Sequence, residues 1–128
     1  MGGMGNYILA MVKAFRVSIA LLLTALLLLA AGPGFRSRRL FDEHYAKHGR
    51  EFGNISRQEY LERAQGLRDA RPGGPILEAV TADGIISRFD RKTGSFGAYN
   101  PDHTIRTFFI PNAGERYFHR QAAQRGAE

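Results

Sequence analysis

Three side chains that can move protons or offset negative charge lie within five residues of one another. His44, Lys47 and His48 are three and four positions apart, a spacing that places them on one face of a helix. Imidazole exchanges protons near neutral pH, and an ammonium group can stabilise a phosphate oxygen. Paired histidines also suit a metal ion, but no carboxylate motif completes that site and Lys47 would repel the cation, so we expect no metal. The structural alternative is a packed imidazole and a solvated Lys.

A second group of cations and hydroxyls lies in the C-terminal half of the chain. Its members are Arg88, Lys92, Thr93, Arg106 and Thr107. Guanidinium, ammonium and hydroxyl groups together can hold phosphate oxygens. Successive side chains of a regular strand point to opposite faces, so Arg106 and Thr107 can serve one site only where a β-bulge intervenes.

The composition restricts the classes of protein that fit. The chain has 128 residues, 18 Lys and Arg against 12 Asp and Glu, and no Cys. This length suits one domain. The lack of Cys excludes a disulfide scaffold, a thiolate zinc site and a Cys nucleophile. Arg outnumbers Lys by 15 to 3, which favours a polyanionic partner. The alternative is that the Arg excess reflects a GC-rich genome and that the positive charge is ordinary solvated surface.

An uncharged apolar run of fifteen residues occupies positions 17–31, after Lys13 and Arg16. A transmembrane helix needs about 20 apolar residues, whereas the core of a cleaved export signal needs about 7 to 15. We therefore predict a signal peptide over residues 1–35, removed near residues 30–35, and a periplasmic or secreted product. The arginines that follow leave open an uncleaved signal anchor in the inner membrane.

Residues 36–128 are predicted to form one α+β domain. Helical periodicity covers residues 35–48, and a capping box of Ser56 and Glu59 starts a second helix over residues 56–68. Strands are predicted by four runs rich in residues that favour β-structure, which are separated by turn pairs. An amphipathic segment then covers residues 115–124. The predicted strands are residues 76–82, 85–90, 95–99 and 104–110. We expect a hydrophobic leader helix, then helices covering one face of a four-stranded antiparallel meander.

Four motifs occur in a defined order along the chain. They are HYAKHGREFG at 44–53, the segment 56–64, RFDRKTGSFGAYN at 88–100 and DHTIRTFFIP at 102–111. In this order they resemble the C-terminal RNase toxin domains of bacterial polymorphic and contact-dependent growth inhibition systems, in the group of barnase, EndoU, colicin D and RelE folds. The resemblance covers about residues 40–121. Such domains usually end a very long delivery protein, whereas here a leader directly precedes the domain.

The resemblance implies a small metal-independent ribonuclease without a cofactor, often active on transfer RNA, with an immunity protein that blocks its cleft. The family's H-x-x-K-H-G falls on His44, Lys47, His48 and Gly49. Its K-T-G falls on Lys92, Thr93 and Gly94, and its R-T-F-F on residues 106–109. A closing aromatic matches Tyr117 or Phe118.

RNA chemistry suggests a role for each group. A base takes the 2′-hydroxyl proton, the oxygen attacks phosphorus, and an acid protonates the leaving 5′-oxygen, which gives a 2′,3′-cyclic phosphate. His44 is the expected base or acid and Lys47 offsets phosphoryl charge. Arg106 and Thr107 would hold the scissile phosphate, and His48 would be the partner acid or would only pack. The expected substrate-binding residues are Arg88, Lys92, Thr93 and Tyr117.

A different class of function is also open. The chain could be a membrane-tethered basic module that holds an anionic partner without turnover. The binding module is favoured over the enzyme if the leader is retained and if His44 and Lys47 do not converge on Arg106 or Thr107.

Overall fold

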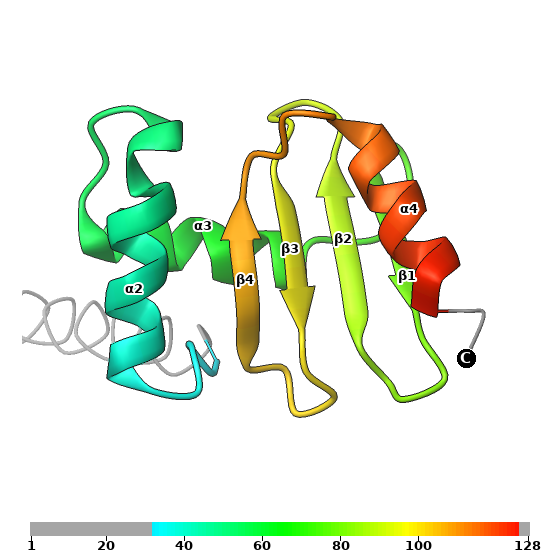
Figure 1. Ribbon diagram of the computed structural model, residues 1–128, viewed down its shortest axis with the longest axis horizontal. Helices are drawn as coiled ribbons and strands as arrows, with labels where there is room; N and C mark the ends of the chain where they lie inside the picture. The colour runs from blue at the N-terminus through cyan, green and yellow to red at the C-terminus, as the bar shows by residue number, and fades with distance from the viewer. Residues whose placement is uncertain (1–31, 126–128) are drawn as a thin grey trace, which may run out of the picture. The chain divides into compact units, whose positions relative to one another are not determined.

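The computed structural model describes residues 32–125 (Figure 1). Its strands form one antiparallel sheet in the order β1-β2-β3-β4, so the predicted α+β class and the meander are confirmed. Residues 1–31 of the predicted leader lie outside the described residues. The elements in chain order are α2 (Arg38–His48), the 3-10 turn η1 (Gly49–Phe52), α3 (Arg57–Asp69), β1 (Ile76–Val80), β2 (Ile86–Asp90), β3 (Phe96–Tyr99), β4 (Ile105–Phe109) and α4 (Glu115–Arg125).

Local signals in the sequence set most of these boundaries. The Ser56 hydroxyl accepts from the Glu59 N–H and the Glu59 carboxylate accepts from the Ser56 N–H, each at 3.1 Å, so the predicted capping box starts α3. Helix α2 begins at Arg38 rather than at residue 35, because Ser37 caps it by accepting from the Leu40 N–H. Gly49 ends α2 in ordinary helical geometry. Its lack of a side chain makes room for the Tyr45 ring, 2.8 Å from where a Cβ would lie.

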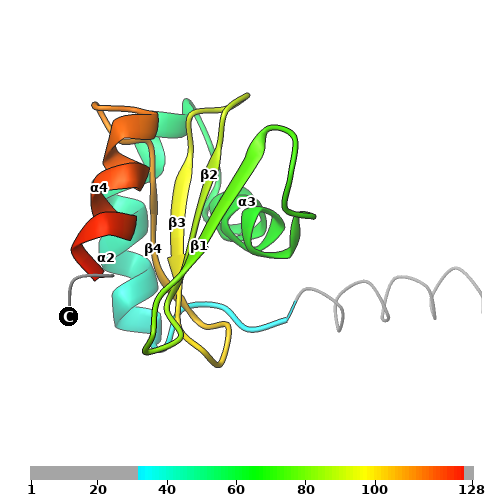
Figure 2. The same cartoon turned by 90° about the vertical axis from the view of Figure 1, so that its right-hand side faces the viewer.

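The helices cover both faces of the sheet, so the prediction of one covered face is wrong. Figure 2 shows α3 on one side of the strands and α4 on the other, with α2 beside β4 on the side of α4. The physical reason lies in neighbouring aromatic residues of β4. Phe108 packs among the residues of α3, whereas Phe109 packs on the α4 face, because successive side chains of a strand point to opposite faces.

The α3 face is built around buried tyrosines whose hydroxyls bond to backbone carbonyls. Tyr60 donates to the Phe108 carbonyl at 2.5 Å, and Tyr99 donates to the Ala64 carbonyl at 2.8 Å. The Tyr99 ring crosses Gly97, where a Cβ would lie 2.3 Å from the hydroxyl oxygen. These bonds join α3 to both β3 and β4, and they satisfy phenol groups that burial would otherwise leave unpaired.

A β-bulge interrupts the pairing of β3 with β4. Ala98 pairs with Thr107 and Tyr99 pairs with Ile105, so Arg106 is the extra residue. As a result Ile105 joins Phe108 in the core on the α3 face, although regular alternation would place these two side chains on opposite faces.

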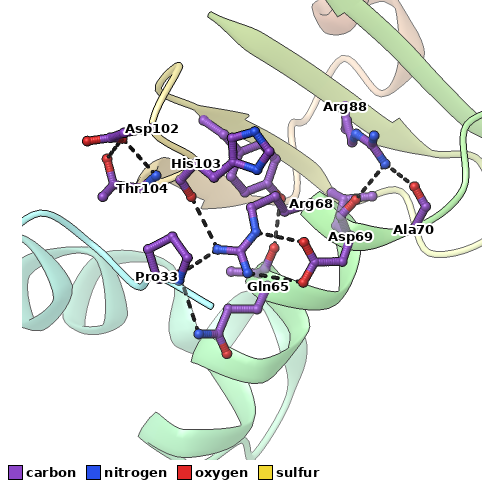
Figure 3. Close-up of polar contacts among 12 residues, drawn as sticks. Pro33, Gln65, Arg68, Asp69, Ala70, Arg88, Asp102, His103 and Thr104 are labelled. Carbon is purple, nitrogen blue, oxygen red and sulfur yellow. Dashed lines mark hydrogen bonds and ion pairs between the residues drawn. The ribbon is translucent and has the colours of Figure 1, made fainter. Parts of the chain in front are cut away.

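Residues 33–35, predicted as the end of the leader, are packed into this domain. The Gly34 carbonyl accepts from the Ile105 N–H at 2.9 Å. The Phe35 ring stacks on Phe41 at 5.5 Å between ring centroids. Figure 3 shows the Pro33 carbonyl held by Arg68, whose side chain also donates to the His103 carbonyl. The compact unit therefore begins at Pro33, three residues before the predicted boundary.

We predict that the folded protein loses stability above pH ~10 because of Tyr60 and Tyr99. Burial raises the pKa of both phenols, so each stays protonated in the folded state after the unfolded chain has ionised. The stability gained from each phenol is complete below the unfolded pKa. It then falls by about 1.4 kcal/mol per pH unit. Urea unfolding at about pH 9 and about pH 11 measures the slope.

The controls for this slope are the Tyr60→Phe and Tyr99→Phe variants. In each variant, the unfolding free energy should fall less steeply above pH ~10, because one ionising phenol is absent. This holds whatever the stability of the variant near neutral pH. A slope that is the same in the wild type and in both variants would contradict the assignment.

We also predict that Phe35→Ala lowers the unfolding free energy of residues 33–128 by about 2 to 3 kcal/mol, because a partly buried ring leaves its aromatic neighbours. The exposed Val80 is a matched site on the opposite edge of the sheet, and Val80→Ala should change stability by less than about 0.5 kcal/mol. Chemical denaturation compares the two. Equal small effects would show that residue 35 is not part of the folded unit.

Candidate functional site

A hollow of about 290 Å³ lies between α2 and β4. It brings together the three predicted residues of the helix and one of the predicted residues of the strand. Its lining is Glu43, His44, Lys47, His48 and Thr107. The α2 spacing puts one helix face over β4. Thr107 lies on that side of the sheet because it is two residues before Phe109 in the regularly paired part of β4.

The hydrogen bond of the His44 ring determines which nitrogen is free. Nδ1 lies 2.8 Å from the Leu40 carbonyl oxygen. A carbonyl can only accept, so Nδ1 carries the hydrogen and the neutral ring has its lone pair on Nε2. Nε2 makes no hydrogen bond with any residue of the range 32–125. The Phe35 ring, 5.0 Å away between centroids, supports the imidazole from the side. His44 is therefore oriented as a proton acceptor.

His48 is held by a carboxylate. Its Nδ1 lies 2.5 Å from one oxygen of Glu51, and the other oxygen accepts from the Ile110 N–H at 2.9 Å. The ring also stacks on Phe109 with centroids 5.1 Å apart. Glu51 thus fixes the orientation of the His48 ring and its tautomer. The two imidazoles face the same hollow with centroids 6.1 Å apart.

The remaining charges at the hollow are one cation and one partly offset anion. Lys47 is exposed and forms no ion pair with the part of the chain that the structure describes. The Glu43 carboxylate is 3.2 Å from the Arg39 guanidinium, which offsets its charge. An anion in the hollow would therefore meet the Lys47 ammonium and any protonated imidazole.

Arg106 lies next to this hollow without lining it. Its guanidinium donates to the Asn100 side-chain oxygen at 2.9 Å. Arg106 lines an adjoining hollow together with Arg36, Leu40, Asn100 and Ile105. Leu40 is one helical turn before His44, and Arg106 directly precedes Thr107, so the two hollows are neighbours along the seam of α2 and β4.

Arg88 belongs to the opposite face of the sheet. Its side chain is buried, with 8% of the residue exposed. The guanidinium donates to the carbonyls of Leu67 and Ala70 and pairs with Glu78. These carbonyls end α3, where a cation is stabilising. Figure 3 includes the contact with Ala70. Arg88 has a structural role here and does not join the hollow at His44, contrary to its predicted place among substrate-binding residues.

The other predicted substrate-binding residues lie in two different places. Thr93 and Lys92 are in the turn between β2 and β3. The Thr93 hydroxyl is 2.7 Å from that of Ser95, and Thr93 lines a separate hollow under α3. Tyr117 packs against Phe109 at 5.3 Å between centroids. Phe109 also stacks on His48, so the rings of His48, Phe109 and Tyr117 form a continuous row, here called the aromatic wall, that leads from the hollow toward α4.

The sequence analysis missed Glu51 and Glu43. Glu51 is three residues after His48, a spacing at which a carboxylate can reach an imidazole on a helix. The continuation of α2 into the 3-10 turn η1 keeps this spacing effective. Glu43 directly precedes His44, and it lines the hollow because β4 lies beside α2.

Within residues 32–125, no group of three potential ligand side chains could hold a metal ion. Over the same residues, no helix has the length and apolar character needed to span a membrane. Comparison with known proteins found no matching protein-family model and no matching curated protein.

We predict that Glu51→Ala releases the His48 ring while His44 stays fixed. Without the carboxylate, neutral His48 should populate both tautomers, whereas His44 remains protonated on Nδ1 by its bond to Leu40. Two-bond ¹H–¹⁵N spectra of the imidazoles at alkaline pH distinguish these states. The loss of the exposed hydrogen bond from Ile110 should also cost about 0.5 to 1.5 kcal/mol.

The matched control is Glu62→Ala, which removes an exposed carboxylate from α3 and should leave both histidines unchanged. Unaltered His48 spectra in Glu51→Ala would contradict the orienting role.

Proposed function

We propose that the domain is a metal-independent endoribonuclease. The observation that carries this proposal is the convergence of His44, Lys47 and His48 from α2 on Thr107 from β4 around one hollow. The basic binding module was expected to lack such convergence. Two imidazoles and an ammonium group beside a hydroxyl provide an acid, a base and two anion-stabilising groups without a metal ion.

In the proposed mechanism, His44 Nε2 accepts the proton of the 2′-hydroxyl and that oxygen attacks the adjacent phosphorus. The bond from phosphorus to the 5′-oxygen breaks, and protonated His48 donates its Nε2 proton to the leaving oxygen. The products are a 2′,3′-cyclic phosphate and a 5′-hydroxyl. Lys47 and Thr107 stabilise the non-bridging oxygens, on which charge increases in the transition state.

The assignment of base and acid follows from the partners of the two rings. His44 donates through Nδ1 to the Leu40 carbonyl, so its Nε2 is the nitrogen left to accept a proton. His48 donates through Nδ1 to the Glu51 carboxylate, so its Nε2 is the nitrogen left to donate a proton to the leaving oxygen. We assign the base to the ring held by a carbonyl and the acid to the ring held by a carboxylate.

The aromatic wall gives the enzyme a surface for a nucleobase. Rings of His48, Phe109 and Tyr117 follow one another with centroid separations of 5.1 Å and 5.3 Å. Bases of single-stranded RNA stack on such rings. Tyr117 is therefore the proposed base-binding residue, with the Arg120 guanidinium 5.9 Å from its ring centroid.

The biological role that we propose follows from the resemblance to bacterial toxin domains. The domain would act as an exported toxin on cellular RNA, transfer RNA included, and a cognate immunity protein would cover the α2–β4 hollow in the producing cell. Contact with a membrane would require that the leader be retained.

The test is cleavage of total bacterial RNA by purified residues 33–128 in EDTA. We expect products with cyclic phosphate ends, and a loss of about 10²- to 10⁴-fold in rate in His44→Ala and in Lys47→Ala. His119→Ala is the matched control, because His119 lies on α4 and pairs with Glu115 outside the hollow.

Activity that depended on added metal, or that survived in both variants, would refute this mechanism. A folded wild-type domain that leaves RNA intact would refute the enzyme and favour the basic binding module.

A further inference from the structure

A second hollow adjoins the one at His44. Its lining is Arg36, Leu40, Asn100, Ile105 and Arg106. The two hollows are neighbours, because the Leu40 carbonyl of one bonds to His44 of the other and Arg106 directly precedes Thr107. One α-helical turn advances about 5.4 Å along the axis, a span that one nucleotide can bridge between successive phosphates.

The guanidinium of Arg106 is positioned by a buried amide. Asn100, of which 3% is exposed, accepts from Arg106 Nη1 at 2.9 Å. The Asn100 side chain is itself fixed, since its Nδ2 donates to the Thr104 hydroxyl at 2.8 Å. Guanidinium has five N–H donors, and within residues 32–125 this contact is the only hydrogen bond of the Arg106 side chain. The remaining donors are available to a ligand.

The charge balance of the adjoining hollow suits a phosphodiester. Arg36 brings a second guanidinium to the lining. Asp102 lies nearby, and hydrogen bonds from Thr104 together with the Arg36 charge lower the pKa of this carboxyl group. Asp102 therefore stays ionised and offsets one cation, so that two arginines and one carboxylate leave a single positive charge. A phosphodiester group carries a single negative charge.

We propose that Arg36 and Arg106 bind the phosphate next to the scissile one in an RNA strand lying along the seam of α2 and β4. This inference rests on the proposed ribonuclease function and specifies its substrate. The preferred substrate is an oligonucleotide with at least two phosphates, and a dinucleoside monophosphate fills only the hollow at His44. Arg106 is then a substrate-binding residue for the neighbouring phosphate and does not hold the scissile one.

The first experiment compares substrates that differ by one phosphate. A dinucleoside monophosphate is offered alone and with an added terminal phosphate on its 5′ or its 3′ side. We expect Arg36→Gln and Arg106→Gln to lower kcat/KM roughly 10- to 100-fold for one of the phosphorylated substrates. Both variants should leave kcat/KM for the unphosphorylated substrate within about twofold of the wild type.

The matched control is Arg38→Gln. It removes the same charge two residues from Arg36, but Arg38 lines a different hollow with Phe41 and Arg57, so it should leave the preference for the added phosphate unchanged. Equal losses on all three substrates in Arg36→Gln and Arg106→Gln would overturn the proposal, because the arginines would then act on the scissile phosphate or on the fold. No loss on any substrate would overturn it too.

A binding measurement separates failure of this inference from failure of the proposed function. The probe is a short oligonucleotide with 2′-O-methyl groups, which cannot undergo 2′-hydroxyl attack. Arg36→Gln and Arg106→Gln should weaken binding and reduce the slope of log K against log salt by about 0.7 each. If the wild type cleaves no RNA but both variants bind the probe more weakly and with a smaller salt slope, the ribonuclease is refuted and the phosphate subsite is retained. Unchanged slopes in both variants would refute the subsite, whatever the cleavage result.

Discussion

The β-bulge at Arg106 is the constraint on which both the core and the candidate site depend. Without it, Ile105 would share a face with Thr107 and Phe109 and would leave the core on the α3 face. With it, Ile105 packs beside Phe108 under α3, and Thr107 still faces α2. Bulges re-aim side chains at the edges of sheets. Here β4 is the edge strand beside α2, and the extra residue places Arg106 and Thr107 in adjoining hollows.

The packing of α2 connects this strand to the proposed chemistry. Tyr45 donates to the Ile55 carbonyl at 2.6 Å, and its ring packs edge-on against Tyr60. Asp42 pairs with Arg57 at the start of α3. These contacts hold the inner face of α2 against α3, so the opposite part of the helix, with His44, Lys47 and His48, is fixed beside β4. The precision that acid and base catalysis needs comes from such rigid supports.

Much of the fold could be predicted from local signals, because each signal acts over a few residues. The capping box at Ser56, the turn pairs and the runs of β-formers located the elements to within a few residues. Their arrangement was harder to predict. The adjacent Phe108 and Phe109 indicate that both sides of β4 are apolar, a signal of helices on both faces. The bulge depends on packing between residues far apart in the sequence, so its presence was not predictable. The alternation of side chains predicted only that Arg106 and Thr107 would need a bulge to serve one site.

The residues of α2 and β4 that line the candidate site could be predicted from the sequence. Glu51, which orients His48, was missed. Side-chain type and helical spacing identified His44, Lys47 and His48, since proton transfer and charge stabilisation need those groups. Arg88 has the same chemical type as a phosphate ligand, but its place on the α3 face commits it to the end of that helix. Residue type alone cannot distinguish a guanidinium that holds the fold from one that faces a hollow.

The segment before α2 links the predicted leader to the candidate site. Phe35 follows the Pro33 carbonyl held by Arg68, and its ring lies against His44. Removal of the leader before Pro33 would leave this support in place. A cut after Phe35 would take away both the ring beside the proposed base and the strand-like contact with Ile105. The geometry of the proposed base is thus coupled to the position at which the predicted leader ends.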